Sequence, residues 1–415
     1  ILQDEEETEE IEEIEEEEEE EINLKSRNFK INCLYFSLFA SYACVSPFLP
    51  VYFASLGFSK TQIGILGSLQ PFVSFLGGTL GTFIADATRK HKMYFILSIF
   101  ISSLLRVCLM FPTQFSHTLG LLLICEITSS SVFPLMDNGV LEMLGKHSDQ
   151  YGKMRLWGAV GWGIVATIVG VVITLTDLRI IFYSHGALTI FSILFALCLP
   201  MTGKQSKKGK ASKRTQVVHL SLFERLRNFL KFEILSFLVI VFVMGYANGT
   251  IVNQLFVYLR ELGANESLFG VAVGVMCVVE VPFFFYSERL ISKIKVSGVI
   301  VFSMSCYVIR LVYYALFGVF QKTTFFENEA ALWIVLPAEA LHGITFAATW
   351  AACVYRGKQV APQGFEGMMQ GLVAGVHWGL GTGIGSAVAG VLADTIGSAA
   401  TFATTAIFIG LTLFG

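Results

Sequence analysis

The chain has 415 residues, of which 54% are hydrophobic and 15% are charged, and its mean hydropathy is +0.65. Soluble globular domains carry about a quarter charged residues, so this composition excludes an ordinary soluble protein and indicates an integral membrane protein. The formal net charge is −3, but acidic residues are concentrated in residues 1–21 and the rest of the chain is basic.

Residues 1–28 begin with a run of glutamates. Such a run has too little apolar surface to fold, so it predicts a disordered, solvated cytoplasmic tail, to which we assign no function. The eight cysteines fall within apolar runs and have neither zinc-binding spacing nor a disulfide framework. We therefore expect no metal and no cofactor.

Six apolar runs follow, each long enough to cross a membrane as a helix of about 20 residues. They lie near residues 31–54, 62–85, 93–112, 117–143, 155–175 and 179–201. Together they make an N-terminal half, residues 29–201.

A basic linker at residues 202–232 separates this half from the next. Its first part is predicted to be flexible, and its second part has the apolar periodicity of a helix lying on the membrane surface. A solvated loop and a site for anionic lipid are the two interpretations of the basic part.

Six more apolar runs make a C-terminal half, residues 233–415. They lie near residues 233–259, 266–287, 297–320, 331–355, 366–391 and from 398 to the end. The last run reaches the end of the sequence, which predicts a truncated helix. The fold class is therefore an all-α polytopic membrane protein with twelve transmembrane helices.

Basic residues set the predicted orientation. Most of the 29 Lys and Arg residues fall in alternate connections, among them residues 25–30, 89–92, 146–155 and the linker. Basic residues accumulate on the cytoplasmic side, so both termini are predicted to be cytoplasmic. Which cellular membrane holds the protein is not indicated.

The two halves repeat one another. Residues 51–64 and 257–270 share Val, Tyr, Leu and two Gly residues in register. Internal repeats of this kind are typical of transporters built from two related halves around a central site. We therefore expect a pseudo-twofold axis between the halves.

Ionisable residues within spans extend this repeat. Arg106 and Glu126 in the first half correspond to Arg310 and Glu339 in the second. Buried charges are costly in a bilayer and are retained mainly where they pair or act, so each Arg is predicted to pair with its Glu. Fixed struts between helices are the alternative to a functional role.

The second half has additional titratable groups. His342 follows Glu339 by one helical turn, and Glu280 lies in the eighth span. A carboxylate whose charge depends on a nearby Arg can exchange a proton when that pairing changes. We therefore predict that Glu339, with Arg310, His342 and Glu280, performs proton coupling.

Other polar and aromatic residues within spans are candidates for contact with a solute. The amides and the carboxylate suit hydrogen bonding, and an indole suits a ring, although aromatic residues in spans more often pack or anchor. These candidates are Asp137, Asn138, Asn248, Asn253, Gln254 and Trp378. Asp137 is an alternative gating or capping residue near the cytoplasmic end of its span.

The chain resembles the major facilitator superfamily over residues 29–415. The segment GTFIADATRKHK, residues 81–92, is similar to the loop between spans two and three of that superfamily, although the usual glycines are displaced. The resemblance implies that Asp86, Arg89 and Lys90 belong to a cytoplasmic gate.

Three further segments resemble the branch with the lactose permease, the phenylpropionate permease and nucleoside symporters: PLMDNGVL, YGKMRLWGAVGWG and EALHGITFAATWAACV. In the lactose permease, carboxylates, an Arg and a His of spans eight to ten couple sugar transport to proton transport. Glu280, Arg310, Glu339 and His342 occupy the corresponding spans, but here the Glu precedes the His. Proton coupling follows from the resemblance, whereas sugar specificity does not.

We therefore predict a secondary active transporter that moves a small organic solute by alternating access in symport with protons. The expected partners are the solute, protons and lipid, with no nucleic acid, and the oligomeric state is not indicated. The alternatives are a facilitative uniporter with structural charges and a non-transporting receptor or scaffold. An intramembrane enzyme is disfavoured because no nucleophile or metal constellation is recognisable. An ATP-driven pump is disfavoured because the sequence contains no Walker phosphate-binding loop.

Overall fold

The computed structural model describes the backbone of residues 2–88, 90–200, 229, 231–321, 329–362 and 365–414. Side chains are described over the same ranges except residues 2–23, 76, 78–83, 86, 146, 148, 149, 318–321, 329, 330 and 414. The regular structure of the described part is entirely helical, with no strand. The predicted all-α polytopic membrane fold is thus confirmed.

The N-terminal half consists of helices that run alternately up and down. They are α1 (Leu2–Val45), α2 (Leu49–Ser55), α3 (Lys60–Thr88), α4 (His91–Cys108), α5 (Phe115–Ser129), α6 (Val132–Leu144), the 3-10 helix η1 (Gly145–Gln150), α7 (Tyr151–Leu175) and α8 (Ile180–Cys198). A break at residues 46–48 separates α1 from α2, and Pro50 stands in the first turn of α2, where its missing N–H costs no hydrogen bond.

The C-terminal half repeats this arrangement. It contains α10 (Phe232–Glu261), α11 (Glu266–Phe285), α12 (Ser287–Gln321), η3 (Glu329–Val335), α13 (Leu336–Ala340), the π-helix η4 (Gly343–Ala348), α14 (Thr349–Val360), α15 (Glu366–Ala374), the π-helix η5 (Gly375–Gly381), α16 (Thr382–Thr395) and α17 (Ser398–Phe414). Lys295, with φ of 62° and ψ of 164°, bends α12, so the ninth span begins after it.

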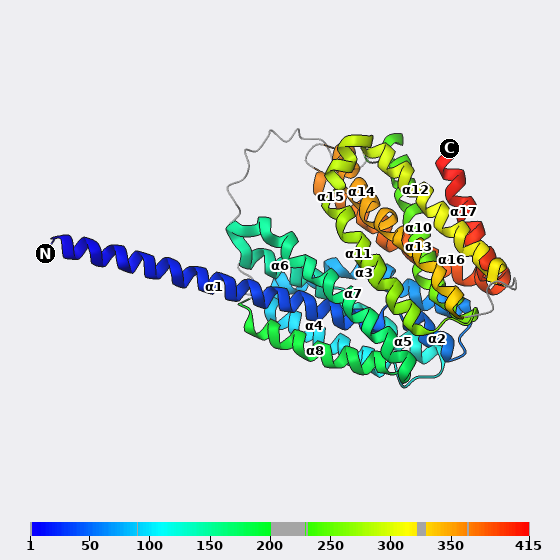
Figure 1. Ribbon diagram of the computed structural model, residues 1–415, viewed down its shortest axis with the longest axis horizontal. Helices are drawn as coiled ribbons and strands as arrows, with labels where there is room; N and C mark the ends of the chain where they lie inside the picture. Colours follow the sequence, from blue (N-terminus) through cyan, green and yellow to red (C-terminus); the bar gives the residue numbers. More distant parts are fainter. Residues whose placement is uncertain are drawn as a thin grey trace.

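Ten helical segments among the described residues are long and apolar enough to cross a membrane. The helix α3 and the shorter apolar helix α17 lie alongside them. The acidic segment at the start of the chain was expected to be disordered. In the structure it belongs to α1, which is helical from Leu2 and projects from the bundle (Figure 1). Glutamate is a good helix former, and extending an existing span avoids the cost of a new helix nucleus.

The two membrane sides are named here by their chain connections. The linker side holds the ends of α6, α8, α11 and α14 and the starts of α7, α10, α12 and α15. The far side holds the ends of α2, α4, α7, α10 and α16 and the starts of α3, α5, α8, α11 and α17. The halves meet along two seams, α7 with α11 and α3 with α16. They lie close together at the far side and diverge toward the linker side (Figure 1).

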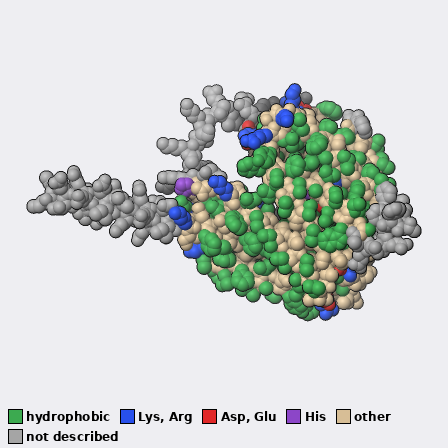
Figure 2. Space-filling view, viewed as in Figure 1, with side chains coloured by type: hydrophobic (Ala, Val, Ile, Leu, Met, Phe, Trp, Pro, Cys, Tyr) green, Lys and Arg blue, Asp and Glu red, His purple; other side chains and the backbone are tan. Residues whose placement is uncertain are grey.

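The surface between the halves is indented on the linker side in the view of Figure 2, and Lys and Arg side chains lie around this indentation. On the opposite side, the buried apolar core continues from one half into the other through residues such as Val51, Phe182 and Leu259. The conformation is therefore closed at the far side and open toward the linker side.

Candidate functional site

The C-terminal half holds a buried charge network centred on Arg310 of α12. Its Nη2 atom lies 3.1 Å from Oε2 of Glu339 in α13, and its Nη1 atom donates to Oγ1 of Thr345 at 2.9 Å. Its Nε atom donates to the Tyr314 hydroxyl at 3.0 Å, and that hydroxyl donates to the other carboxylate oxygen of Glu339. Arg310 and Glu339 are 1% and 0% exposed, so charge and hydrogen bonds are satisfied inside the protein.

Arg310 also joins His342 to this network. Its Nη1 atom lies 3.5 Å from Nδ1 of His342, which therefore accepts. The imidazole stacks on Phe346 with ring centres 5.1 Å apart, and Phe346 contacts Trp378 of η5. These rings stand beside two π-helical segments, which recur at functional sites because they interrupt regular helical hydrogen bonding.

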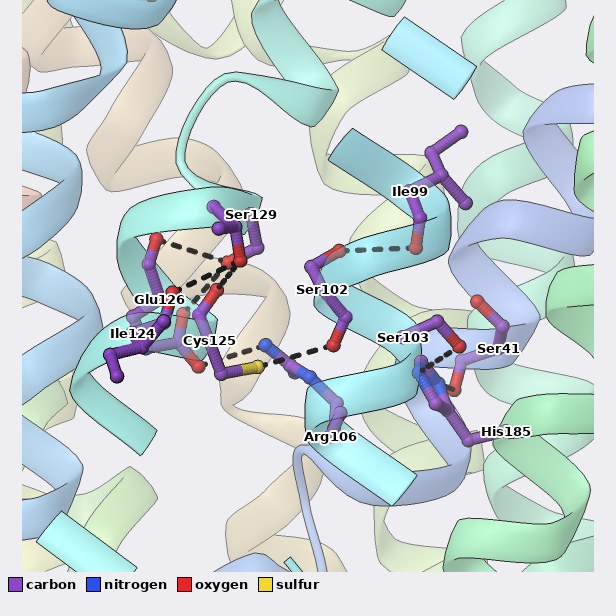
Figure 3. Close-up of polar contacts among 11 residues, drawn as sticks. Ser41, Ile99, Ser102, Ser103, Arg106, Ile124, Cys125, Glu126, Ser129 and His185 are labelled. Carbon is purple, nitrogen blue, oxygen red and sulfur yellow. Dashed lines mark hydrogen bonds and ion pairs between the residues drawn. The ribbon is translucent and has the colours of Figure 1, made fainter. Parts of the chain in front are cut away.

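The N-terminal half holds the related pair (Figure 3). Arg106 of α4 contacts Glu126 of α5 through Nη2 and Oε1 at 2.8 Å, and Ser129 donates to the second carboxylate oxygen at 3.1 Å. The guanidinium lies 4.7 Å above the Tyr42 ring of α1. The structure thus brings together the residues of both predicted pairs.

His185 of α8 is a further buried residue of this half, which the sequence analysis did not single out. It is 1% exposed; its Nδ1 donates to the carbonyl of Ser41 at 2.8 Å, and its Nε2 lies 3.1 Å from the Ser103 hydroxyl (Figure 3). Its ring meets Tyr42 edge to face. A histidine within an apolar run was the available sequence signal.

Glu280 of α11 lies apart from the Arg310 network. It makes no hydrogen bond or ion pair with another described residue, and the charge that acts on it is that of Arg155 in α7. The seam between these two helices is the boundary between the halves. Arg155 also acts on Tyr151, close to Asp137, whose carboxylate accepts from the Tyr35 hydroxyl at 2.7 Å.

Charges from both halves therefore face one another at this seam. The sequence analysis counted Arg155 among loop residues, whereas it lies in the second turn of α7 with an exposed side chain. Its guanidinium lies 5.4 Å from the Phe39 ring centre. An exposed cation that acts on a carboxylate of the other half suits contact with a polar or ionic solute.

The other predicted solute contacts are divided between buried and exposed positions. Asn248, Asn253 and Gln254 of α10 are 6%, 3% and 0% exposed, whereas Asn138 of α6 is exposed. Nδ2 of Asn253 and both amide atoms of Gln254 have no hydrogen-bond partner among the described residues. Trp378 is partly buried among aromatic rings. The structure does not gather these residues into one site.

Of the predicted cytoplasmic gate, Arg89 and the Asp86 side chain lie outside the described residues, and Lys90 is exposed at the start of α4. Much of the linker, residues 201–228 and 230, lies outside them as well. Within the described part, no cluster of His, Cys, Asp and Glu could hold a metal ion.

Comparison with known proteins identifies transporters. Residues 28–404 match the model of the MFS_1 like family. The uncharacterized transporter YwbF of Bacillus subtilis is 23% identical over 80% of this chain and 78% of its own length. The maltose permease of Geobacillus stearothermophilus is 23% identical over 79% and 78%, and a probable 3-phenylpropionic acid transporter of Escherichia coli is 25% identical over 75% and 77%.

Solved structures share the fold. The nucleoside transporter NupG superposes with a TM-score of 0.78 at 15% identity, covering 93% of this chain and 97% of that one. A POT family transporter in complex with a thioalcohol-conjugated peptide gives a TM-score of 0.70 at 12% identity, covering 93% and 94%. These relatives are transporters rather than enzymes.

Proposed function

Because the chain belongs to the MFS_1 like family, we propose that it moves a small organic solute across a membrane by alternating access, in symport with protons. Closure of the halves at the far side, with an opening toward the linker side, supports alternating access. With the termini and linker in the cytoplasm, as the basic residues favour, this conformation faces inward.

The observation that carries the proton-coupling proposal is the attachment of Glu339 and His342 to a single guanidinium, that of Arg310. A cation in contact with a carboxylate favours the charged form of that carboxylate. In this proposal, a shift of α12 relative to α13 weakens the contact of Arg310 with Glu339 and allows Glu339 to take up a proton. The π-helix η4, which begins directly after His342, is a segment where such a shift costs few regular hydrogen bonds.

We further propose that the solute binds where Arg155 and Asp137 of one half face Glu280 of the other. Glu280 lies within a span without a hydrogen-bonded partner among the described residues, and an intramembrane carboxylate is retained where it acts. A solute that contacts both halves there links its own binding to the relative position of the halves. Maltose, 3-phenylpropionate and a nucleoside are the first solutes to test, since relatives are named for solutes of these kinds.

Uptake into proteoliposomes tests proton coupling, and the two buried pairs provide matched variants. With an acidic exterior, the wild type is expected to accumulate a transported solute of this panel above its external concentration. Glu339→Gln is expected to abolish accumulation while solute exchange between the two sides continues, because exchange needs no net proton movement. Glu126→Gln removes the corresponding carboxylate of the other half and is expected to retain accumulation when equal amounts of folded protein are reconstituted.

Each alternative has its own outcome. Accumulation by Glu339→Gln at the wild-type level would refute its role as proton carrier. A facilitator would bring the solute to equal concentrations whether or not a pH gradient is present. A receptor or scaffold would show saturable binding of a panel solute without exchange.

A further inference from the structure

The far-side seal includes two glycine-on-glycine helix contacts, one in each seam. A Cβ atom on Gly64 of α3 would lie 2.9 Å from Cα of Gly390 in α16, and one on Gly170 of α7 would lie 2.7 Å from Cα of Gly270 in α11. Both contacts stand near the far ends of their helices. The absence of side chains lets the backbones of the two halves touch, so these seams close without side-chain rearrangement.

Each seam is also capped across the halves at a helix N-terminus. In the α3 seam, the backbone N–H groups of Lys60 and Thr61 donate to the two carboxylate oxygens of Asp394, at 3.0 and 2.7 Å. In the α11 seam, the backbone N–H of Ser267 donates to Oγ1 of Thr174 at 3.0 Å. The first N–H groups of a helix have no partner within it, and the helix dipole favours an anion there.

The α3 seam therefore carries the charged cap and the α11 seam a neutral one. Lys60 adds an ion pair across the halves, with Nζ 2.7 Å from Oε1 of Glu261, and Ser398 bonds both side chains. Asp394 is exposed, so its contact is modest and solvent can replace it. A contact of that strength can break and form in every transport cycle.

One buried group opposes the seal. Asn253 of α10 reaches across to α3, with Oδ1 against the position that a Cβ of Gly67 would occupy. Its Nδ2 has no hydrogen-bond partner among the described residues. A buried amide without a partner destabilises the state that buries it. Closure of the far side is thus favoured by the caps, by the Lys60–Glu261 ion pair and by a hydrogen bond from Arg260 to the Val51 carbonyl at 2.9 Å, and it is opposed by the Asn253 amide.

We propose that Asp394 is the releasable latch of the far-side gate, and that Asn253 sets how easily the latch opens. The inference rests on the alternation between two conformations proposed above, but it does not depend on the solute or on protons. Removal of the Asp394 carboxylate opens both seams together, because the halves move as bodies. Removal of the Asn253 amide has the opposite effect on the same seams.

Hydrogen exchange followed by mass spectrometry of the full chain in detergent tests this proposal without any solute. The Lys60 and Thr61 amides report the α3 seam directly, and the Ser267 amide reports the other seam. Asp394→Ala is expected to speed exchange of peptides 58–64 and 265–270 by about fivefold, the usual effect of losing a cap. Asp394→Asn retains one acceptor without the charge and is expected to give a smaller effect.

Two further variants make the outcome decisive. Asn253→Leu keeps the branching of the side chain and is expected to slow exchange in both peptides severalfold. Glu233→Gln breaks the linker-side pair of Glu233 and Arg356, 2.8 Å apart within one half, and is expected to change neither peptide. Faster exchange confined to peptide 58–64 in Asp394→Ala would show local fraying and overturn the latch. Faster exchange in Asn253→Leu would overturn its opposing role.

Discussion

The buried pair of Arg106 and Glu126 allows a quantitative prediction about the free energy of unfolding. The two charges are 2.8 Å apart and the residues are 2% and 4% exposed. At an effective dielectric constant of about 20 their attraction is about 6 kcal/mol. Desolvation of each ion costs several kcal/mol, so the pair contributes little net stability while either charge alone is unfavourable. Arg106→Met is therefore expected to destabilise the protein by about 3–5 kcal/mol.

The double variant Arg106→Met with Glu126→Leu removes both charges and is expected to remain within about 1 kcal/mol of the wild type, or to exceed it. Unfolding by titration with SDS in mixed micelles, followed by tryptophan fluorescence, measures both values. Arg356→Met breaks an exposed pair and serves as the control, with an expected loss of at most about 1 kcal/mol. A double variant as unstable as the single one would refute the reasoning and show that the pair itself stabilises the half.

A Cβ added at Gly270 would lie 2.7 Å from a backbone carbonyl of α7, so Gly270→Ala is expected to cost about 1–3 kcal/mol in the same unfolding assay. A Cβ atom added at Gly371 would have no other atom within 4 Å, so Gly371→Ala is expected to stabilise its helix by about 1 kcal/mol at most. Tyr314→Phe leaves Oε1 of Glu339 without its buried donor and is expected to cost about 1–3 kcal/mol, whereas Tyr313→Phe removes an exposed bond and is expected to cost less. Equal losses within either matched set would contradict these assignments.

The spans and the paired charges could be predicted from sequence because each follows from a strong local rule. A run of about 20 apolar residues has few stable alternatives to a membrane helix, and an Arg within such a run requires a partner. Glycines recur every four residues along span eleven, a spacing typical of a helix packing surface. Cβ atoms on Gly375, Gly379 and Gly383 would meet Phe75 or Phe72 of α3, whereas Gly371 faces nothing within 4 Å.

Arg155 and Asp394 could not be assigned from sequence because their roles depend on the other half of the molecule. Arg155 lies near a predicted span boundary, where a basic residue is ordinarily a solvated anchor. Asp394 lies just after the predicted end of span eleven, where an acidic residue is equally ordinary. Glu280, on which the charge of Arg155 acts, and the first turn of α3, which Asp394 caps, lie far away in sequence. Local patterns carry no information about such pairings.

The two halves share more than the sequence repeat shows, and they differ in one contact. Each half joins an Arg and a Glu to a nearby Tyr, and each has a His beside this set. In the N-terminal half, His185 bonds Ser41 and Ser103, its ring meets Tyr42, and no hydrogen bond joins it to Arg106 among the described residues. In the C-terminal half, Arg310 itself contacts both the carboxylate and the imidazole.

Glu339 and His342 contact the same guanidinium, so a change in the charge of Glu339 alters the electrostatic environment of His342. The described contacts of Glu126 and His185 include no shared group of this kind. The sequence analysis assigned coupling to the C-terminal half because His342 and Glu280 had no counterparts in the first half. His185 weakens that reason. The direct contact of Arg310 with His342 replaces it and is the physical basis for assigning proton coupling to this half.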